Sequence, residues 1–258
     1  VTLANSLCSR YEVEIATCYK LYDKCVFDLD SRVKVKYLNK DLKPNHAALK
    51  SAFKSKNIIK MIKESSFALK VLYKRKKSIV KYIRTKKCDV IISTRDIFNY
   101  WLGAYGEDNV LKIGWEHNHF HEDYKYATNV INSAKGLDYL VLVSSDLNKF
   151  YSRKLKNSNC TCVYIPNSIE KIPKNIAPLN KKSFVSVGRL SPEKGYLDLL
   201  KLYKLIKKKY PDWVLNIIGD GPERKKLEEF IKDNDLEENV ILHGYQGKDY
   251  IDKVLHNS

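Results

Sequence analysis

The chain has 258 residues and 44% of them are hydrophobic, which is enough for two folded domains and excludes a wholly disordered chain. Its longest apolar runs, such as residues 137–143, are strand-sized, so the sequence predicts no membrane-spanning helix. The six cysteines show neither C-x-x-C pairs nor histidines at zinc-finger spacing, which argues against a metal site or disulfide framework and favours a reducing, cytoplasmic setting.

The formal net charge of +17 is unevenly distributed along the chain. Residues 183–258 carry 13 Lys/Arg and 13 Asp/Glu, so the whole excess lies in the first 182 residues. The densest basic run, residues 50–87, contains Glu64 as its only acid and interleaves isoleucines and leucines with the lysines. This pattern predicts long amphipathic helices with a basic face. The face is either merely solvated, or attracted to an anionic membrane surface, or to another anion such as nucleic acid.

Strand-sized apolar runs alternate with helix-length segments along the first part of the chain, which predicts an α/β fold. The runs show little polar alternation, as is typical of parallel strands covered on both faces, and a doubly wound sheet is expected. The predicted strands are residues 12–17, 33–37, 89–93, 111–115, 139–143 and 162–165.

A proline-containing segment without periodicity, residues 168–182, predicts a linker between two domains, 1–170 and 171–258. The strand and helix pattern then restarts. Strands are predicted at 183–187, 213–218 and 240–243, and helices at 194–210, at 223–234 and from about 248. These elements make only part of a second doubly wound domain, so this domain is expected to be incomplete within the sequence.

Two turns of the second domain carry residues suited to anion binding. In the first, Gly188 permits close backbone approach, Arg189 offers a planar fork of donors and Lys194 adds a charge near a helix N-terminus. The second turn, residues 219–222, is Gly-Asp-Gly-Pro. Because the carboxyl ends of parallel strands share one edge of the sheet, both turns are expected at one ligand-binding edge, where a diphosphate would fit.

From residue 184 to 245 the sequence resembles the donor-binding domain of retaining glycosyltransferases with the GT-B fold. This family, glycosyl transferases group 1, includes sucrose synthase, mannosyltransferases and many bacterial capsule and lipopolysaccharide enzymes. Three motifs occur in order at family-like separations. They are Gly188-Arg189-Leu190 followed by Glu193-Lys194-Gly195, then Ile218-Gly219-Asp220-Gly221-Pro222, then Val240-Ile241-Leu242-His243-Gly244-Tyr245.

The resemblance implies two Rossmann-like domains, an acceptor-side domain at 1–170 and a nucleotide-sugar-binding domain at 171–258. It implies transfer of a sugar from a nucleotide-diphosphate donor to a glycan or lipid-linked acceptor, with retention of configuration, in cell-surface polysaccharide synthesis. No metal or cofactor is expected, and no nucleic acid partner. The protein would be cytoplasmic, and peripheral at the inner face of the membrane if its basic domain binds anionic lipid.

The resemblance also assigns roles to individual residues. Arg189 and Lys194 would grip the diphosphate beside Gly188, and His117 would lie near the donor sugar. The further donor-binding residues implied are Gly219, Asp220, Gly221 and Tyr245.

Two departures accompany the resemblance. The family's pair of glutamates is expected beyond Ser258, and its first strand with a glycine-rich loop before Val1. Residues 1–258 alone are therefore expected to show little transferase activity.

Simpler interpretations of the same residues remain open. Arg189 and Lys194 could be surface charges, and Asp220 a turn residue. His117 could belong to a solvated polar loop with His119 and His121, or to a metal site. The rival functions are another GT-B enzyme, such as a nucleotide-sugar epimerase, and a basic nucleic-acid-binding module, for which the sequence contains no recognised motif.

Overall fold

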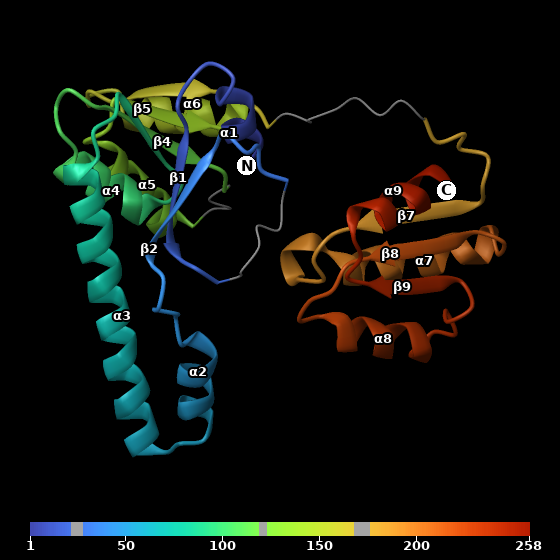
Figure 1. The fold of residues 1–258 in the computed structure, drawn as a ribbon. Helices are drawn as coiled ribbons and strands as arrows, with labels where there is room; N and C mark the ends of the chain where they lie inside the picture. The colour runs from blue at the N-terminus through green and yellow to red at the C-terminus, as the bar shows by residue number, and fades with distance from the viewer. Residues whose placement is uncertain (22–27, 119–122, 168–175) are drawn as a thin grey trace. The chain divides into compact units, whose positions relative to one another are not determined.

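The computed structural model describes residues 1–21, 28–118, 123–167 and 176–258. It divides into two compact units, Val1–Glu170 and Lys171–Ser258, each with parallel strands and its own hydrophobic core (Figure 1). The α/β architecture predicted from the sequence is therefore confirmed. Across these four stretches, no helix is both long and apolar enough to cross a membrane. The first eight residues of the predicted linker, 168–175, lie outside the described residues.

Unit 1 alternates helices and strands. In chain order it contains α1 (Thr2–Leu7), β1 (Glu14–Tyr19), β2 (Lys34–Asn39), α2 (His46–Lys54), α3 (Ile58–Thr85), β3 (Val90–Ser93), α4 (Asp96–Tyr105), β4 (Leu111–Glu116), α5 (Tyr124–Ala134), β5 (Tyr139–Leu142), α6 (Ser145–Lys154) and β6 (Thr161–Tyr164). The strands form a parallel pair, β1-β2, and a parallel sheet ordered β3-β4-β5-β6. Parallel pairing requires crossover connections, which α4, α5 and α6 supply.

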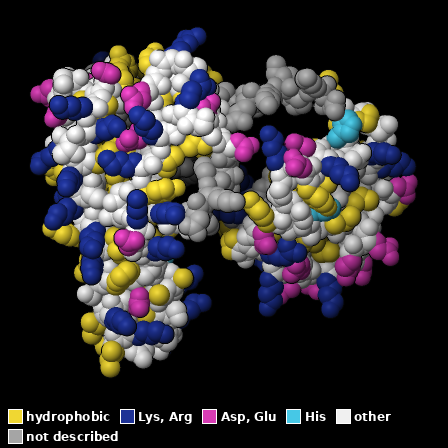
Figure 2. All heavy atoms as spheres, viewed as in Figure 1, with side chains coloured by type: hydrophobic (Ala, Val, Ile, Leu, Met, Phe, Trp, Pro, Cys, Tyr) yellow, Lys and Arg dark blue, Asp and Glu magenta, His cyan; other side chains and the backbone are white. Residues whose placement is uncertain are grey.

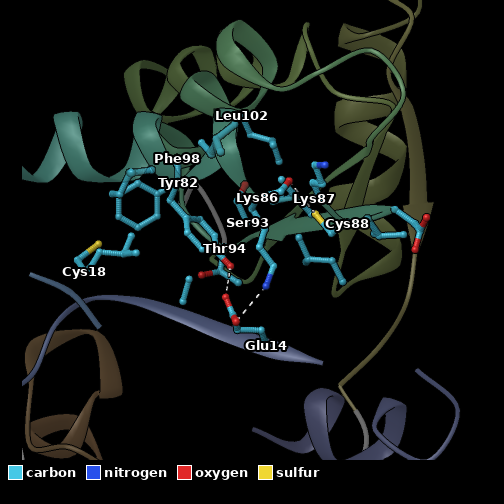
Figure 3. Close-up of a pocket in the computed structure, with 18 of the residues that line it drawn as sticks. Glu14, Cys18, Tyr82, Lys86, Lys87, Cys88, Ser93, Thr94, Phe98 and Leu102 are labelled. Carbon is cyan, nitrogen blue, oxygen red and sulfur yellow. Dashed lines mark hydrogen bonds and ion pairs between the residues drawn. The ribbon is translucent and has the colours of Figure 1, made fainter. Parts of the chain in front are cut away.

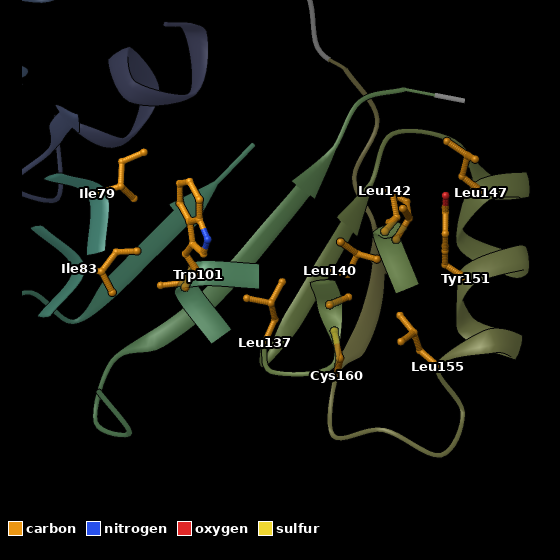
Figure 4. Close-up of a cluster of buried hydrophobic side chains, with 13 residues drawn as sticks. Ile79, Ile83, Trp101, Leu137, Leu140, Leu142, Leu147, Tyr151, Leu155 and Cys160 are labelled. Atoms are coloured by element: carbon orange, nitrogen blue, oxygen red, sulfur yellow. The ribbon is translucent and has the colours of Figure 1, made fainter. Parts of the chain in front are cut away.

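The hydrophobic core of unit 1 consists of side chains from the sheet and from the helices that alternate with its strands. Figure 4 shows the cluster running from Ile79 and Ile83 of α3, past Trp101 of α4, to Tyr151 of α6. Leu140 and Leu142 of β5 are completely buried within it. Helix α6 begins where Ser144 Oγ accepts a hydrogen bond from the Leu147 amide at 3.2 Å, the contact of a serine N-cap.

A cavity of about 390 Å³ is lined by residues of β1, of β3 and of the C-terminal part of α3, among them Glu14, Tyr82 and Ser93 (Figure 3). Tyr82 of α3 donates a hydrogen bond to Glu14 of β1 at 2.5 Å, and Lys86 pairs with the same carboxylate at 3.0 Å. The Tyr82 hydrogen bond holds the pKa of Glu14 below its ordinary value. The expectation that the strands are covered on both faces is wrong for β3, where Val90 and Ile92 are exposed, because β3 ends its sheet and borders this cavity.

Unit 2 contains β7 (Ser183–Val187), η1 (Pro192–Lys194), α7 (Tyr196–Lys209), β8 (Val214–Ile218), α8 (Arg224–Asp233), β9 (Val240–Gly244) and α9 (Lys248–His256). Its parallel sheet has the order β7-β8-β9. Tyr203 of α7 and Leu227 of α8 are buried against the sheet, on the helix faces that the apolar periodicity predicts. Leu200, which lies beside the predicted stripe of α7, is buried as well.

One predicted helix boundary in unit 2 is wrong. Lys194 does not begin the long helix but ends the short 3-10 turn η1, and α7 starts at Tyr196. Gly195 separates the two because its backbone is left-handed, with a φ of +68°. Lys194 therefore lies two residues before the start of α7 rather than on its first residue.

Candidate functional site

The turns that follow β7, β8 and β9 meet at one edge of the unit 2 sheet. The strands are parallel, and Val187 pairs with Ile218, which in turn pairs with Gly244. Their carboxyl ends therefore coincide, as predicted from the sequence. This edge carries Gly188, Arg189, Lys194, Gly219, Asp220, Gly221 and Tyr245.

Backbone hydrogen bonds tie these turns together. The amide of Gly188 donates to the Ile218 carbonyl at 2.9 Å, and the amide of Leu190 donates to the Asp220 carbonyl at 3.0 Å. The amide of Gly219 donates to the Gly244 carbonyl at 2.8 Å, so the third turn joins the other two. The edge is therefore a single hydrogen-bonded unit of backbone rather than separate loops.

Gly219 makes this arrangement possible. Its φ is +144°, and a Cβ built there would lie 1.8 Å from the Gly188 carbonyl oxygen. A side chain at this position would collide with the backbone of the neighbouring turn. The glycine thus permits the β7 and β8 turns to touch.

Arg189 is exposed but already oriented by a carboxylate. Its Nη2 pairs with Glu193 Oε1 at 2.6 Å, and the buried Ser191 hydroxyl donates to the same oxygen at 2.7 Å. The Ser191 hydrogen bond, together with Arg189, lowers the pKa of Glu193 to about 2. An anion that binds the guanidinium must therefore compete with an ionised Glu193.

The other predicted residues on this edge differ in their surroundings. Lys194 is exposed in η1, and Tyr245 is exposed immediately after β9. Asp220 Oδ1 accepts a hydrogen bond from the amide of the next residue, Gly221, at 2.7 Å. Its second oxygen lies 3.8 Å from Arg224 Nη1. The carboxylate is thus engaged in the turn and in an ion pair.

Arg224 is a candidate that the sequence reasoning missed. It is the first residue of α8, and its Nη1 would lie 3.3 Å from a Cβ built on Gly244, so the side chain reaches toward the end of β9. It also pairs with Glu228 at 2.8 Å. The signal for it was its place two residues after the Gly-Asp-Gly-Pro turn, at the start of a helix where anions bind. The edge therefore carries a third cation.

His117 lies in unit 1, immediately after the carboxyl end of β4. The ring is exposed and stacks on Trp115, with centroids 5.7 Å apart and planes 4° from parallel. The structure therefore places His117 at the carboxyl edge of its own sheet. His119 and His121 lie outside the described residues.

Glu116, the last residue of β4, is also missed by the sequence analysis. It is 3% exposed, and its Oε1 accepts a hydrogen bond from the Asn118 amide at 2.7 Å. Burial raises the pKa of this carboxyl. In the sequence, Glu116 is indistinguishable from the other polar residues that follow Trp115. In the structure its side chain is buried, and its hydrogen bond to the Asn118 amide fixes the backbone on either side of His117.

Comparison of the sequence with known families matches Glycosyl transferases group 1 over residues 167–258. An uncharacterized glycosyltransferase of Haemophilus influenzae is 32% identical over 136 residues, which is 51% of this chain and 38% of that protein. The lipopolysaccharide 1,6-galactosyltransferase of Salmonella typhimurium is 29% identical over 133 residues, 50% of this chain and 35% of that protein. The chain thus spans well under half the length of these relatives.

Solved structures show the same fold. The crystal structure of TarM has a TM-score of 0.61 at 20% identity, covering 71% of this chain and 38% of TarM. A mutant of S. aureus TarM, with a TM-score of 0.56, was crystallised with fondaparinux, alpha-GlcNAc-glycerol and UDP. The chain therefore has the α/β fold of GT-B glycosyltransferases, and its residues 167–258 match the glycosyl transferases group 1 family.

Proposed function

We propose that this protein transfers a sugar from a nucleoside-diphosphate donor to a glycan or lipid-linked acceptor, and that the edge formed by the β7, β8 and β9 turns binds the donor diphosphate. The observation that carries the proposal is that one edge of the sheet bears three cations, Arg189, Lys194 and Arg224. The turns at this edge are joined by backbone hydrogen bonds, and Gly219 permits their close contact. The family match to residues 167–258 and the UDP bound by a TarM mutant support it.

The chemistry follows from where charge develops. As the bond between the anomeric carbon and the phosphate oxygen breaks, negative charge grows on the departing diphosphate. Fixed cations near that position stabilise the transition state more than the ground state. The acceptor oxygen forms the new bond to the anomeric carbon, and its proton passes to the departing phosphate. Such a route retains the anomeric configuration when acceptor and leaving group share one face of the sugar.

The roles of the remaining residues are part of the proposal. His117 would contact the donor sugar from unit 1, with buried Glu116 holding its segment in place. Exposed Tyr245, at the end of β9, would lie beside the nucleobase. A lipid-linked acceptor in polysaccharide synthesis would place the reaction at the inner face of the cell membrane. The lipopolysaccharide galactosyltransferase among the relatives supports this choice of acceptor class.

The proposed donor site is tested by titrating the chain with UDP and with UMP in a calorimeter. UDP should bind more tightly than UMP, since the second phosphate provides the contacts with the cations. Arg189→Ala and Lys194→Ala should each weaken UDP binding by about 10- to 100-fold, the range expected when a hydrogen bond to a charged group is lost. UMP binding should change much less.

Glu193→Gln is the matched variant with the opposite expected sign. It keeps the size of the side chain but removes the charge that competes for Arg189, so UDP should bind several-fold more tightly. If the two cation variants bind UDP as well as the unmodified chain does, the donor site is elsewhere. Transfer is then measured with the protein expressed from its whole gene and a UDP-sugar that is labelled in the sugar. The label should move to the acceptor, and this transfer should depend on Arg189. Conversion of the donor sugar without any acceptor would indicate an epimerase instead.

A further inference from the structure

The α2–α3 hairpin, residues 46–85, is anchored at only one end. The C-terminal part of α3 buries Ile79 and Ile83 in the core of unit 1, and Tyr82 bonds to Glu14. The N-terminal part of α3 packs along α2 and extends past the ends of the unit 1 strands (Figure 1). The hairpin is therefore held firmly in place while most of its length projects from unit 1.

Helix α3 has two apolar faces, and only one of them is covered. Val71 of α3 is buried, as is Ala52 of α2, the helix that packs along the N-terminal part of α3. On another face, Ile58, Ile62, Leu69 and Tyr73 follow helical spacing and are 71%, 66%, 67% and 66% exposed. Neighbouring Ile59 is 81% exposed. Here these five residues are called the apolar stripe. A contiguous exposed stripe of large apolar side chains marks an interaction surface rather than scattered surface residues.

Positive charge accompanies the stripe. Helix α3 contains nine Lys/Arg and one acid, Glu64, whose carboxylate accepts a hydrogen bond from Asn45 at 2.7 Å. By helical spacing Lys63, Lys70 and Lys74 lie along one side of the stripe. Lys63 and Lys70 also line a surface groove beside Phe67. Figure 2 shows hydrophobic and basic side chains together over the projecting part of unit 1.

We propose that the hairpin binds the surface of a membrane containing anionic lipid, with the apolar stripe among the upper acyl chains and the flanking lysines at the headgroup phosphates. A helix with exposed large apolar residues on one face and lysines beside them matches interfacial membrane helices. Nucleic acid would use the cations but has no use for exposed isoleucines. An acidic protein partner is the remaining alternative, and the experiment below separates it. The inference deepens the proposed function by naming the surface at which a lipid-linked acceptor would be met.

The experiment is co-sedimentation of the chain with phosphatidylcholine vesicles, with and without phosphatidylglycerol. Binding should require phosphatidylglycerol and weaken as salt is raised. The triple variant Lys63→Gln, Lys70→Gln, Lys74→Gln should bind at least ~10-fold more weakly, since each lysine near an anionic surface contributes to attachment. The triple variant Ile58→Ser, Ile62→Ser, Leu69→Ser should also lose binding, although it keeps every charge.

A matched control removes the same charge from unit 2. Lys207→Gln, Lys208→Gln, Lys209→Gln alters a run of three lysines on α7 and should leave vesicle binding within about two-fold of the original. All substituted side chains are on helix surfaces, so circular dichroism should show the original helix content. Ile62→Trp should additionally shift tryptophan emission to shorter wavelength only when anionic vesicles are present.

Three results would overturn the inference. They are equal binding to both kinds of vesicle, full binding by the apolar variant, and binding to RNA or an acidic protein with no binding to vesicles. The test is separate from the donor site because it needs no nucleotide, and UDP titration of the same variants should be unchanged. Failure on vesicles with intact UDP binding removes only this inference, whereas the reverse pattern removes only the donor site.

Discussion

Two regions present cations but hold them in different ways. One is the edge of unit 2 formed by the β7, β8 and β9 turns, which is proposed to bind the donor and is called here the donor edge, and the other is the α2–α3 hairpin of unit 1. At the donor edge, Arg189 and Arg224 are each paired with a carboxylate and stand on turns joined by backbone hydrogen bonds. Residues 183–258 carry equal numbers of acids and bases. In the hairpin, by contrast, the basic residues of α3 far outnumber its acidic residues, and the helix is anchored in the core of unit 1 at one end only.

The difference matches the two proposed ligands. A diphosphate is small, so its cations must point to one place, and local acids keep them oriented and suppress binding of other anions. A membrane is a broad surface, so the number of charges and the apolar area matter more than the direction of any one side chain. Balanced charge with rigid backbone therefore indicates a small-molecule site, and excess charge on a projecting amphipathic helix indicates a surface.

The largest effect is expected at Gly219, which tests whether the donor edge depends on backbone contact. Gly219→Ala places a Cβ 1.8 Å from the Gly188 carbonyl, so the β7 and β8 turns must separate. We expect a loss of about 3 kcal/mol or more in the stability of unit 2. Hydrogen exchange measured by mass spectrometry should show lost protection in β7, β8 and β9 and unchanged protection in unit 1.

Gly195→Ala is the control for backbone conformation alone. Gly195 also has positive φ, at +68°, but a Cβ there meets no atom within 4 Å. Its cost should be about 1 kcal/mol, the penalty of a left-handed non-glycine residue. Equal effects of the two substitutions would mean that conformation, and not contact between the turns, decides the stability of the edge.

Tyr82→Phe should have an intermediate effect, and it tests the anchor of the hairpin. The substitution removes the hydroxyl that donates to Glu14 at 2.5 Å and leaves the aromatic ring. A hydrogen bond to a carboxylate of this kind contributes about 1–2 kcal/mol. Exchange protection should fall in β1 and in the C-terminal part of α3, and unit 2 should not respond. Unchanged protection in α3 would show that Ile79 and Ile83 hold the hairpin without the hydrogen bond.

The smallest effect concerns His243, which links β9 to β8 and α9 through polar contacts. Its ring nitrogens lie 2.8 Å from Asn216 Oδ1 and 2.8 Å from the Tyr250 hydroxyl, and burial lowers its pKa. A neutral ring can donate to Asn216 and accept from Tyr250, whereas a protonated ring would disturb this pattern.

Because the folded state then binds fewer protons than the unfolded state, stability rises with pH up to the ordinary histidine pKa of about 6.5 and is lost as the pH falls below it. The ring is only partly buried, so the change in unit 2 between about pH 7.5 and pH 5.5 should be under ~1 kcal/mol. His243→Gln should reduce this dependence, as measured by exchange protection of β9. If the variant keeps the full dependence, other groups are responsible.

The sequence was most informative in unit 2. Each of its strands is followed by a turn with glycine or proline, and Tyr203 and Leu227 are buried on the faces that helical spacing predicts. The expectation for α7 was wrong only at its start, since Gly195 inserts a left-handed residue after Lys194. Glycine is compatible with many conformations, so its presence alone did not show this break.

By itself, then, the amino-acid sequence determined the α/β class, the strand-end motifs that resemble a donor site, and the location of the excess charge. These properties depend on the order and spacing of residues that are near one another in the sequence, so they can be predicted without knowing which distant residues come into contact. Only the tertiary structure decided that Glu193 forms an ion pair with Arg189, that the Glu116 side chain is buried, and that one apolar face of α3 stays exposed. Both apolar faces of α3 repeat with the same helical period, and which one is covered depends on where α2 packs.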